Sequence, residues 1–124
     1  MAWLLAPLYD PIMAGVERSC LARWRRELLS SAEGAVLEIG AGTGVNLQHY
    51  PESVARLVLL EPDPGMRRQL VDKSSHMGHV EICEEPSESL PYDNDTFETV
   101  VSTLVLCTTP QPALALAELH RVLR

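Results

Sequence analysis

Short apolar runs alternate along the chain with stretches that carry helical spacing or turn residues. Runs of about four to eight apolar residues are typical of buried strands, and apolar residues at every third and fourth position are typical of helices. The pattern predicts strands at 35–39, 55–60, 80–83 and 97–106, and helices at 11–29, 45–50, 64–73 and 112–124. Strands that alternate with helices favour a parallel sheet with right-handed crossovers. We therefore predict an α/β fold, a doubly wound parallel sheet of about four strands with helices on both faces.

Turn residues and chain length set the expected boundaries. Asp10 and Asp63 can each cap the free amides of a first helical turn, and the proline that follows each suits the first helical position. The polar, proline-containing stretch 84–96 predicts a long loop. A chain of 124 residues leaves room for one core. We therefore expect a helical N-terminal segment, 1–34, that packs on a domain formed by 35–124.

The first predicted strand ends in three glycines at alternate positions, Gly40, Gly42 and Gly44. Glycines in such a turn let the backbone come very close to a ligand. A phosphate-binding loop needs a lysine after its last glycine, and none stands near this turn. A dinucleotide site needs Gly-x-Gly-x-x-Gly, whose last place falls on Val45. The spacing therefore excludes both kinds of site.

Two glutamates stand at the ends of the first two predicted strands. Glu38 precedes the glycines and would oppose a phosphate, but it suits a ligand that carries an ammonium group. Glu61 follows the second strand, where a carboxylate can accept hydrogen bonds from both ribose hydroxyls. S-adenosylmethionine has an ammonium group, a ribose and no phosphate, so we predict it as the cofactor. The two acids at matching strand ends argue against a glycine turn with no ligand.

Several segments resemble one enzyme family. Residues 38–44 (EIGAGTG) are similar to motif I of the class I S-adenosylmethionine-dependent methyltransferases, and 61–66 (EPDPGM) match the end of the next strand. Residues 87–98 (SESLPYDNDTFE) and 118–124 (ELHRVLR) resemble segments of the type 11 branch. These segments follow the family order through most of the chain after position 35. The resemblance implies a Rossmann-like fold and methyl transfer from S-adenosylmethionine.

The resemblance also implies a set of cofactor contacts. The glycines would let the backbone pass along the methionine portion, Glu38 would lie near its amino group, and Glu61 would bind the ribose. In relatives an acid contacts the adenine amino group; Pro86 takes that place here, and Glu85 is the nearest replacement. An N-terminal tyrosine closes over the cofactor in relatives. The expected cofactor-binding residues are Tyr9, Glu38, Gly40, Ala41, Gly42, Gly44, Asn46, Glu61, Pro62, Met66, Glu85, Ser87, Glu88, Ser102 and Thr103.

The acceptor is inferred from a narrower resemblance. Residues 46–51 (NLQHYP) and 103–107 (TLVLC) are similar to thiol S-methyltransferases and to bacterial phospholipid N-methyltransferases. This similarity implies a thiol or amine on a small molecule or lipid as the nucleophile. Methyl transfer is an in-line displacement that needs mainly alignment, and a general base is required only for some nucleophiles. The sequence therefore names no catalytic residue.

Charge and cysteine content limit the partners and the compartment. The net charge of −7 argues against nucleic acid. The arginines at 18–26 predict a solvated helix face, and peripheral contact with an anionic membrane is the alternative. Unpaired cysteines favour the reducing cytoplasm, and we expect Cys107 to be buried and unreactive. His76, His79 and Cys83 lack a shared face and a fourth ligand, so no metal site is predicted.

Relatives of the resembling family continue after the segment equivalent to 118–124 with further strands. We therefore expect a fragment or short form, or a sheet that a partner completes, a second copy of the chain included. Without such a partner the outer edge of the strand at 97–106 would stay uncovered. Two hypotheses remain at this stage: an enzyme that transfers a methyl group, and a non-catalytic cofactor-binding or interaction module.

Overall fold

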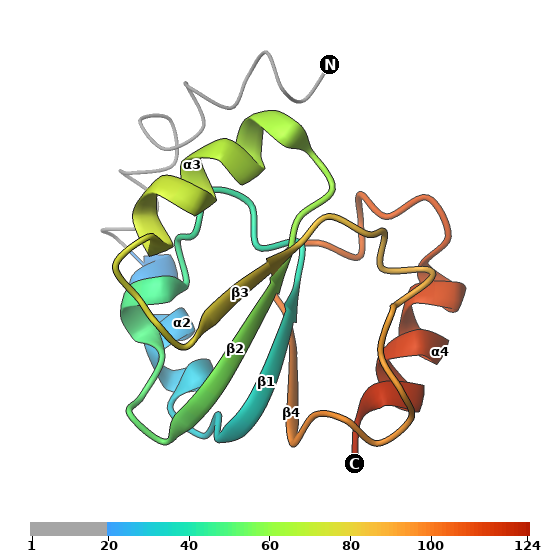
Figure 1. Ribbon diagram of the computed structural model, residues 1–124, viewed down its shortest axis with the longest axis horizontal. Helices are drawn as coiled ribbons and strands as arrows, with labels where there is room; N and C mark the ends of the chain where they lie inside the picture. Colours follow the sequence, from blue (N-terminus) through green and yellow to red (C-terminus); the bar gives the residue numbers. More distant parts are fainter. Residues whose placement is uncertain (1–19) are drawn as a thin grey trace.

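Four parallel strands form one sheet in the order β3-β2-β1-β4. The computed structural model describes residues 20–124, and Figure 1 shows the strands side by side between flanking helices. The strands are β1 (Gly34–Ile39), β2 (Val54–Leu60), β3 (Val80–Cys83) and β4 (Thr99–Ser102). The predicted Rossmann-like α/β fold with a parallel sheet is therefore confirmed. Whether a partner covers the outer edge of β4 stays a prediction.

The helices alternate with the strands in the predicted order. They are α2 (Ala22–Leu29), the 3-10 turn η2 (Leu47–His49), α3 (Pro64–Ser74) and α4 (Pro112–Val122). The start of α3 follows the predicted cap, because the Asp63 side chain accepts a hydrogen bond from the Met66 amide at 2.8 Å. The helix predicted at 45–50 is only a single 3-10 turn, in which the His49 amide donates to Asn46 O.

The core lies in two layers, one on each face of the sheet. Successive residues of a strand point to opposite faces, and both faces are covered here, which explains the nearly continuous apolar runs of β1 and β2. One layer joins the sheet to α2 and α3 through Leu29, Val36, Leu57, Leu59 and Leu70. The other joins it to α4 through Leu37, Ile39, Val58, Leu60, Leu119 and Val122.

The fourth strand is shorter than the predicted 97–106, since β4 covers only 99–102. Phe97 forms an isolated bridge with Leu123, beyond α4, instead of pairing within the sheet. Leu104 has a φ of +57°, and this left-handed backbone cannot continue a strand. The chain therefore leaves the sheet early, and Cys107 is exposed, which corrects the expectation of a buried thiol.

Helix α2 is the described part of the helix predicted at 11–29; positions 11–19 lie outside the described residues. The expectation of a solvated arginine face is wrong for Arg25, whose exposed fraction is 6%. Trp24 and Leu28 are 62% and 58% exposed instead. The charged side chain of Arg25 points inward because it forms hydrogen bonds there with Asn46 and Thr103. Among residues 20–124, no helix combines the length and the apolar character needed to cross a membrane.

An ion pair fixes α4 to the long loop at 84–96. Arg121 donates to the Glu118 carboxylate at 2.7 and 2.9 Å, and to the carbonyl oxygens of Leu90 at 3.1 Å and Tyr92 at 2.7 Å. The Leu90 amide in turn donates to Glu118 at 2.8 Å. The hydrogen bonds from Arg121 and from the Leu90 amide lower the pKa of Glu118 to about 2.

Replacing Glu118 by glutamine should therefore destabilise the protein at neutral pH. A carboxyl with a lowered folded-state pKa contributes stability above its unfolded value, and this stability is lost as the pH falls from about 4.5 toward about 2. Thermal unfolding of E118Q should show a midpoint several degrees below that of the wild type near neutrality. The gap should close toward pH ~2, where the wild-type carboxyl is protonated as well. A gap that stays constant with pH would contradict the assignment.

Candidate functional site

The glycine turn lies at the carboxyl end of β1, in the centre of the sheet. Gly40, Gly42 and Gly44 have φ values of +59°, +60° and +93°, a region that side chains other than glycine rarely adopt. A Cβ placed on Gly40 would collide with the Val105 side chain, whereas one on Gly42 would meet no atom within 4 Å. The backbone at Gly42 therefore faces open space that a ligand can occupy.

Glu61 joins this turn to the end of β2. Its Oε2 accepts a hydrogen bond from the Gly42 amide at 3.2 Å, and the residue is only 7% exposed. Burial raises the pKa of the Glu61 carboxyl, although the amides of Gly42 and Asp63 oppose that effect. The residue adjoins a cavity and can still accept hydrogen bonds there.

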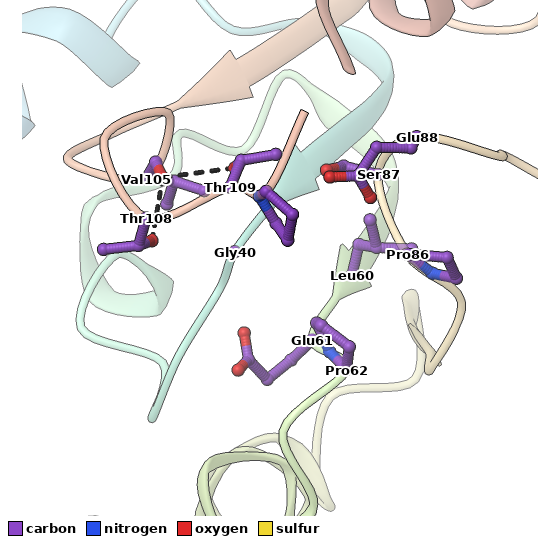
Figure 2. Close-up of a pocket in the computed structure, with 11 residues that line it drawn as sticks. Gly40, Leu60, Glu61, Pro62, Pro86, Ser87, Glu88, Val105, Thr108 and Thr109 are labelled. Carbon is purple, nitrogen blue, oxygen red and sulfur yellow. Dashed lines mark hydrogen bonds between the residues drawn. The ribbon is translucent and has the colours of Figure 1, made fainter. Parts of the chain in front are cut away.

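A cavity of about 340 Å³ opens beside Glu61. Figure 2 shows the segments around it: the ends of β1 and β2, the loop after β3, and the turn after β4. The turn after β4 is folded by hydrogen bonds from the Thr108 and Thr109 hydroxyls to Val105 O, at 2.9 and 3.2 Å. The residues that line the cavity are Gly40, Leu60, Glu61, Pro62, Pro86, Ser87, Glu88, Val105, Thr108, Thr109 and Pro110.

Five of the residues expected to bind the cofactor line this cavity: Gly40, Glu61, Pro62, Ser87 and Glu88. Among them Glu88 is distinctive, because its Oε1 is buried and has no hydrogen-bond partner. A buried acceptor without a donor is costly, so a ligand donor would stabilise it. The cavity thus offers two carboxylates as acceptors, and its remaining wall is largely apolar.

The other expected residues lie around the cavity or away from it. Ala41 is buried, Met66 lies in the first turn of α3, and Glu85 is exposed. Ser102 and Thr103 line a shallow groove beside α2 with Trp24 and Leu28, not the cavity itself. Tyr9 lies outside the described residues. Gly42 and Gly44 belong to the glycine turn itself, and Glu38 and Asn46 belong to a buried polar cluster beneath it.

That cluster begins with Arg25 of α2. Its Nη1 donates to Asn46 Oδ1 at 2.8 Å and to Thr103 Oγ1 at 3.2 Å, and Asn46 Nδ2 donates to the same Thr103 oxygen at 3.1 Å. The three side chains connect α2, the segment after the glycines and the residue after β4. Arg25 was not predicted as a site residue. Its place one helical turn before the buried Leu29 was the available signal.

Glu38 completes the cluster. It is 2% exposed, and its Oε1 accepts a hydrogen bond of 2.5 Å from the Tyr50 hydroxyl. Burial raises the pKa of Glu38 to about 7, while hydrogen bonds from Tyr50 and Asn46 and the charge of Arg25 act against burial. The same contact and burial raise the pKa of Tyr50 well above its usual range, so its hydroxyl stays a donor. Sequence reasoning also missed Tyr50.

Replacing Glu38 by glutamine should stabilise the folded protein above neutral pH. Because the folded-state pKa lies above the unfolded one, the folded protein loses stability as the pH rises from about 4.5 to above 7. An uncharged amide removes that loss, which is on the order of 3 kcal/mol at most. The unfolding midpoint of E38Q should exceed that of the wild type at about pH 8, and by much less at about pH 5. Exposed Glu52→Gln is the matched control, and an E38Q effect independent of pH would refute the prediction.

Comparisons with known proteins identify the family of the chain. A family model described as a methyltransferase domain matches residues 37–124. The human thiol S-methyltransferase TMT1B is 35% identical over 112 residues, which make up 81% of this chain and 46% of that protein. The phosphatidylethanolamine N-methyltransferase of Cereibacter sphaeroides is 31% identical over 94 residues, or 73% of this chain and 46% of that one.

The fold is shared with solved structures as well. A structure of a SAM-dependent methyltransferase from Thermotoga maritima, described as a possible histamine N-methyltransferase, superposes with a TM-score of 0.77 at 22% identity. The superposition covers 98% of this chain and 55% of that one. The chain therefore belongs to the type 11 methyltransferase domain family. It spans about half the length of the curated relatives it matches.

Proposed function

We propose that this chain binds S-adenosylmethionine in the cavity beside Glu61 and serves methyl transfer to a thiol or amine on a small molecule or lipid. The observation that carries the proposal is the contact between two neighbouring strand ends. The open backbone at Gly42 is joined by one hydrogen bond to the carboxylate of Glu61, which lines the cavity. Membership of the methyltransferase family supports the same conclusion.

The residues present fit the chemical groups of this cofactor. Glu61 offers a carboxylate to the ribose hydroxyls, which are paired donors. Glu88 offers a buried, unpartnered oxygen that suits the exocyclic amine of adenine, with the apolar Leu60 and Pro62 beside it. The glycine turn leaves room for the methionine portion at Gly42, and the charge of Glu38 beneath the turn favours an ammonium group.

The chemistry of methyl transfer does not require an acid–base pair in the cavity. When bound, the cofactor would supply a methyl group activated by a sulfonium; in-line attack on that carbon would break the sulfur–methyl bond and leave the neutral thioether S-adenosylhomocysteine. The protein then contributes mainly proximity and alignment. Glu61, Glu88 and the glycine turn would fix the cofactor, and the largely apolar wall that includes Val105 would limit access of water near the turn.

The acceptor class rests on the relatives. Two of them are named as a thiol S-methyltransferase and a phosphatidylethanolamine N-methyltransferase, so thiols and lipid amines are the first acceptors to test. Transfer of labelled methyl groups to a panel of both would separate the enzyme from a non-catalytic cofactor-binding module. A chain that binds the cofactor and methylates no member of the panel would favour the module.

Replacing Glu61 by alanine should weaken cofactor binding by at least about tenfold, because the ribose loses a charged acceptor. Titration calorimetry with S-adenosylhomocysteine, the demethylated product, measures the change directly. Glu84→Gln is a suitable control, since Glu84 is exposed and pairs with Arg67 at the protein surface. An unchanged affinity in E61A would refute the ribose assignment, and no binding by the wild type at about millimolar ligand would refute the cofactor itself.

Replacing Glu88 by glutamine should change the preference for the base. The wild type should bind S-adenosylhomocysteine at least about tenfold more tightly than S-inosylhomocysteine, whose carbonyl would face the carboxylate as a second acceptor. An amide at position 88 can donate to that carbonyl, so E88Q should lose most of the preference. Glu85→Gln, at the exposed position favoured by the sequence resemblance, should keep it. The opposite pattern would assign the adenine contact to Glu85.

A further inference from the structure

The orientation of the Asn46 amide is set by a residue of another helix. Arg25 is a donor without acceptor atoms, so the amide presents its oxygen to Arg25, at 2.8 Å. The Nδ2 group must then point the other way, and it donates to Thr103 Oγ1 at 3.1 Å. The Asn46 amide also supports the ionised form of Glu38 by hydrogen bonding.

We propose that Arg25 is a positioning residue for the cofactor: through Asn46 and Thr103 it holds the buried carboxylate of Glu38 ready for the ammonium end of S-adenosylmethionine. This inference rests on the proposed cofactor. It adds a function for a residue that does not line the cavity and that the sequence placed on a solvated face.

Because Arg25, Asn46 and Glu38 are all buried, the loss of any one hydrogen-bond donor among them would leave another polar group unpaired. Arg25 is 6% exposed, Asn46 is 1% exposed and Glu38 is 2% exposed. Water therefore cannot replace a lost donor, and an unpaired polar group in such a place is costly. Loss of the guanidinium would free the amide to turn, and Glu38 would lose both a hydrogen-bond donor and a nearby positive charge.

The groups that act on Glu38 come from each element around it. Arg25 contributes a positive charge from α2, Asn46 and Tyr50 contribute hydrogen bonds from either side of η2, and Glu61 contributes a negative charge from the end of β2. Of these groups, Arg25 is the one that both carries a positive charge and fixes the orientation of the Asn46 amide. Its removal should therefore favour the protonated, uncharged form of Glu38, which does not attract an ammonium group.

The test compares two ligands that differ at one end. S-adenosylhomocysteine carries the amino-acid end, whereas 5′-methylthioadenosine has the same adenosine part and lacks that end. In Arg25→Met the affinity for S-adenosylhomocysteine should fall by about tenfold or more, and the affinity for 5′-methylthioadenosine should change by less than about twofold. Thr103→Val, which removes the shared acceptor with little change of shape, should act in the same direction. If R25M fails to fold, the same comparison of the two ligands is made with T103V alone.

The pH profile supplies a second readout. For the wild type, binding of S-adenosylhomocysteine should weaken as the pH falls through about 7, and in R25M this transition should move to higher pH. Arg23→Met is the matched control, because Arg23 is exposed and pairs only with Glu27 in the described contacts. Its affinities and profile should match those of the wild type.

Each outcome has a defined meaning. Equal weakening of both ligands in R25M and T103V would make Arg25 a merely structural residue and overturn the inference. Unchanged binding of both ligands would overturn it as well. Failure of the wild type to bind either ligand would instead refute the proposed cofactor, so the two failures are distinguishable by the wild-type titration alone.

Discussion

A carboxylate buried at the end of the central strand is the constraint on which the rest of the site depends. Glu38 is 2% exposed, and removing an ionised carboxylate from water costs several kcal/mol unless partners compensate. The partners come from segments on both sides of it in the sequence: Arg25 before β1, Asn46 and Tyr50 after it. Folding must therefore bring these segments together before the buried carboxylate can be accommodated. The glycine turn follows Glu38 closely in the chain, so it lies next to this polar cluster.

The partners of Glu38 do not fully compensate for the cost of burying its charge. This shortfall relates the stability of the fold to its function. A pKa near 7 means that the folded protein holds Glu38 close to the balance between its neutral and charged forms. An amide in its place could still accept a hydrogen bond from the Tyr50 hydroxyl and would carry no desolvation cost for a charge. A chain selected for stability alone would have no reason to keep an acid here. Its presence argues for a ligand that needs the negative charge.

The sequence was sufficient to predict those helices and strands that are specified by neighbouring residues. The apolar runs of β1 and β2 and the Asp63 cap of α3 needed no tertiary information. The early end of β4 could not be predicted, because it depends on the left-handed backbone of Leu104 within a stretch rich in apolar and β-branched residues. Arg25 was assigned to a solvated face, since its partners are 21 and 78 residues away in the chain. Spacing could place Arg25 on the helix face of Leu29, but it carries no information about which side chains Arg25 would contact there.

The two acids at the strand ends, Glu38 and Glu61, differ in how each could recognise a ligand. Glu61 adjoins the cavity and bonds to the Gly42 amide, so it can reach neutral donors such as hydroxyls directly. Glu38 lies beneath the turn without lining the cavity, and from there only its charge acts over distance, in a medium that screens it weakly. In the proposed site, direct hydrogen bonding would select the sugar by geometry, whereas the buried charge would select the ammonium by sign. In the proposed assignment both acids act on the cofactor and neither on the acceptor, so the same residues are compatible with thiol and with amine nucleophiles.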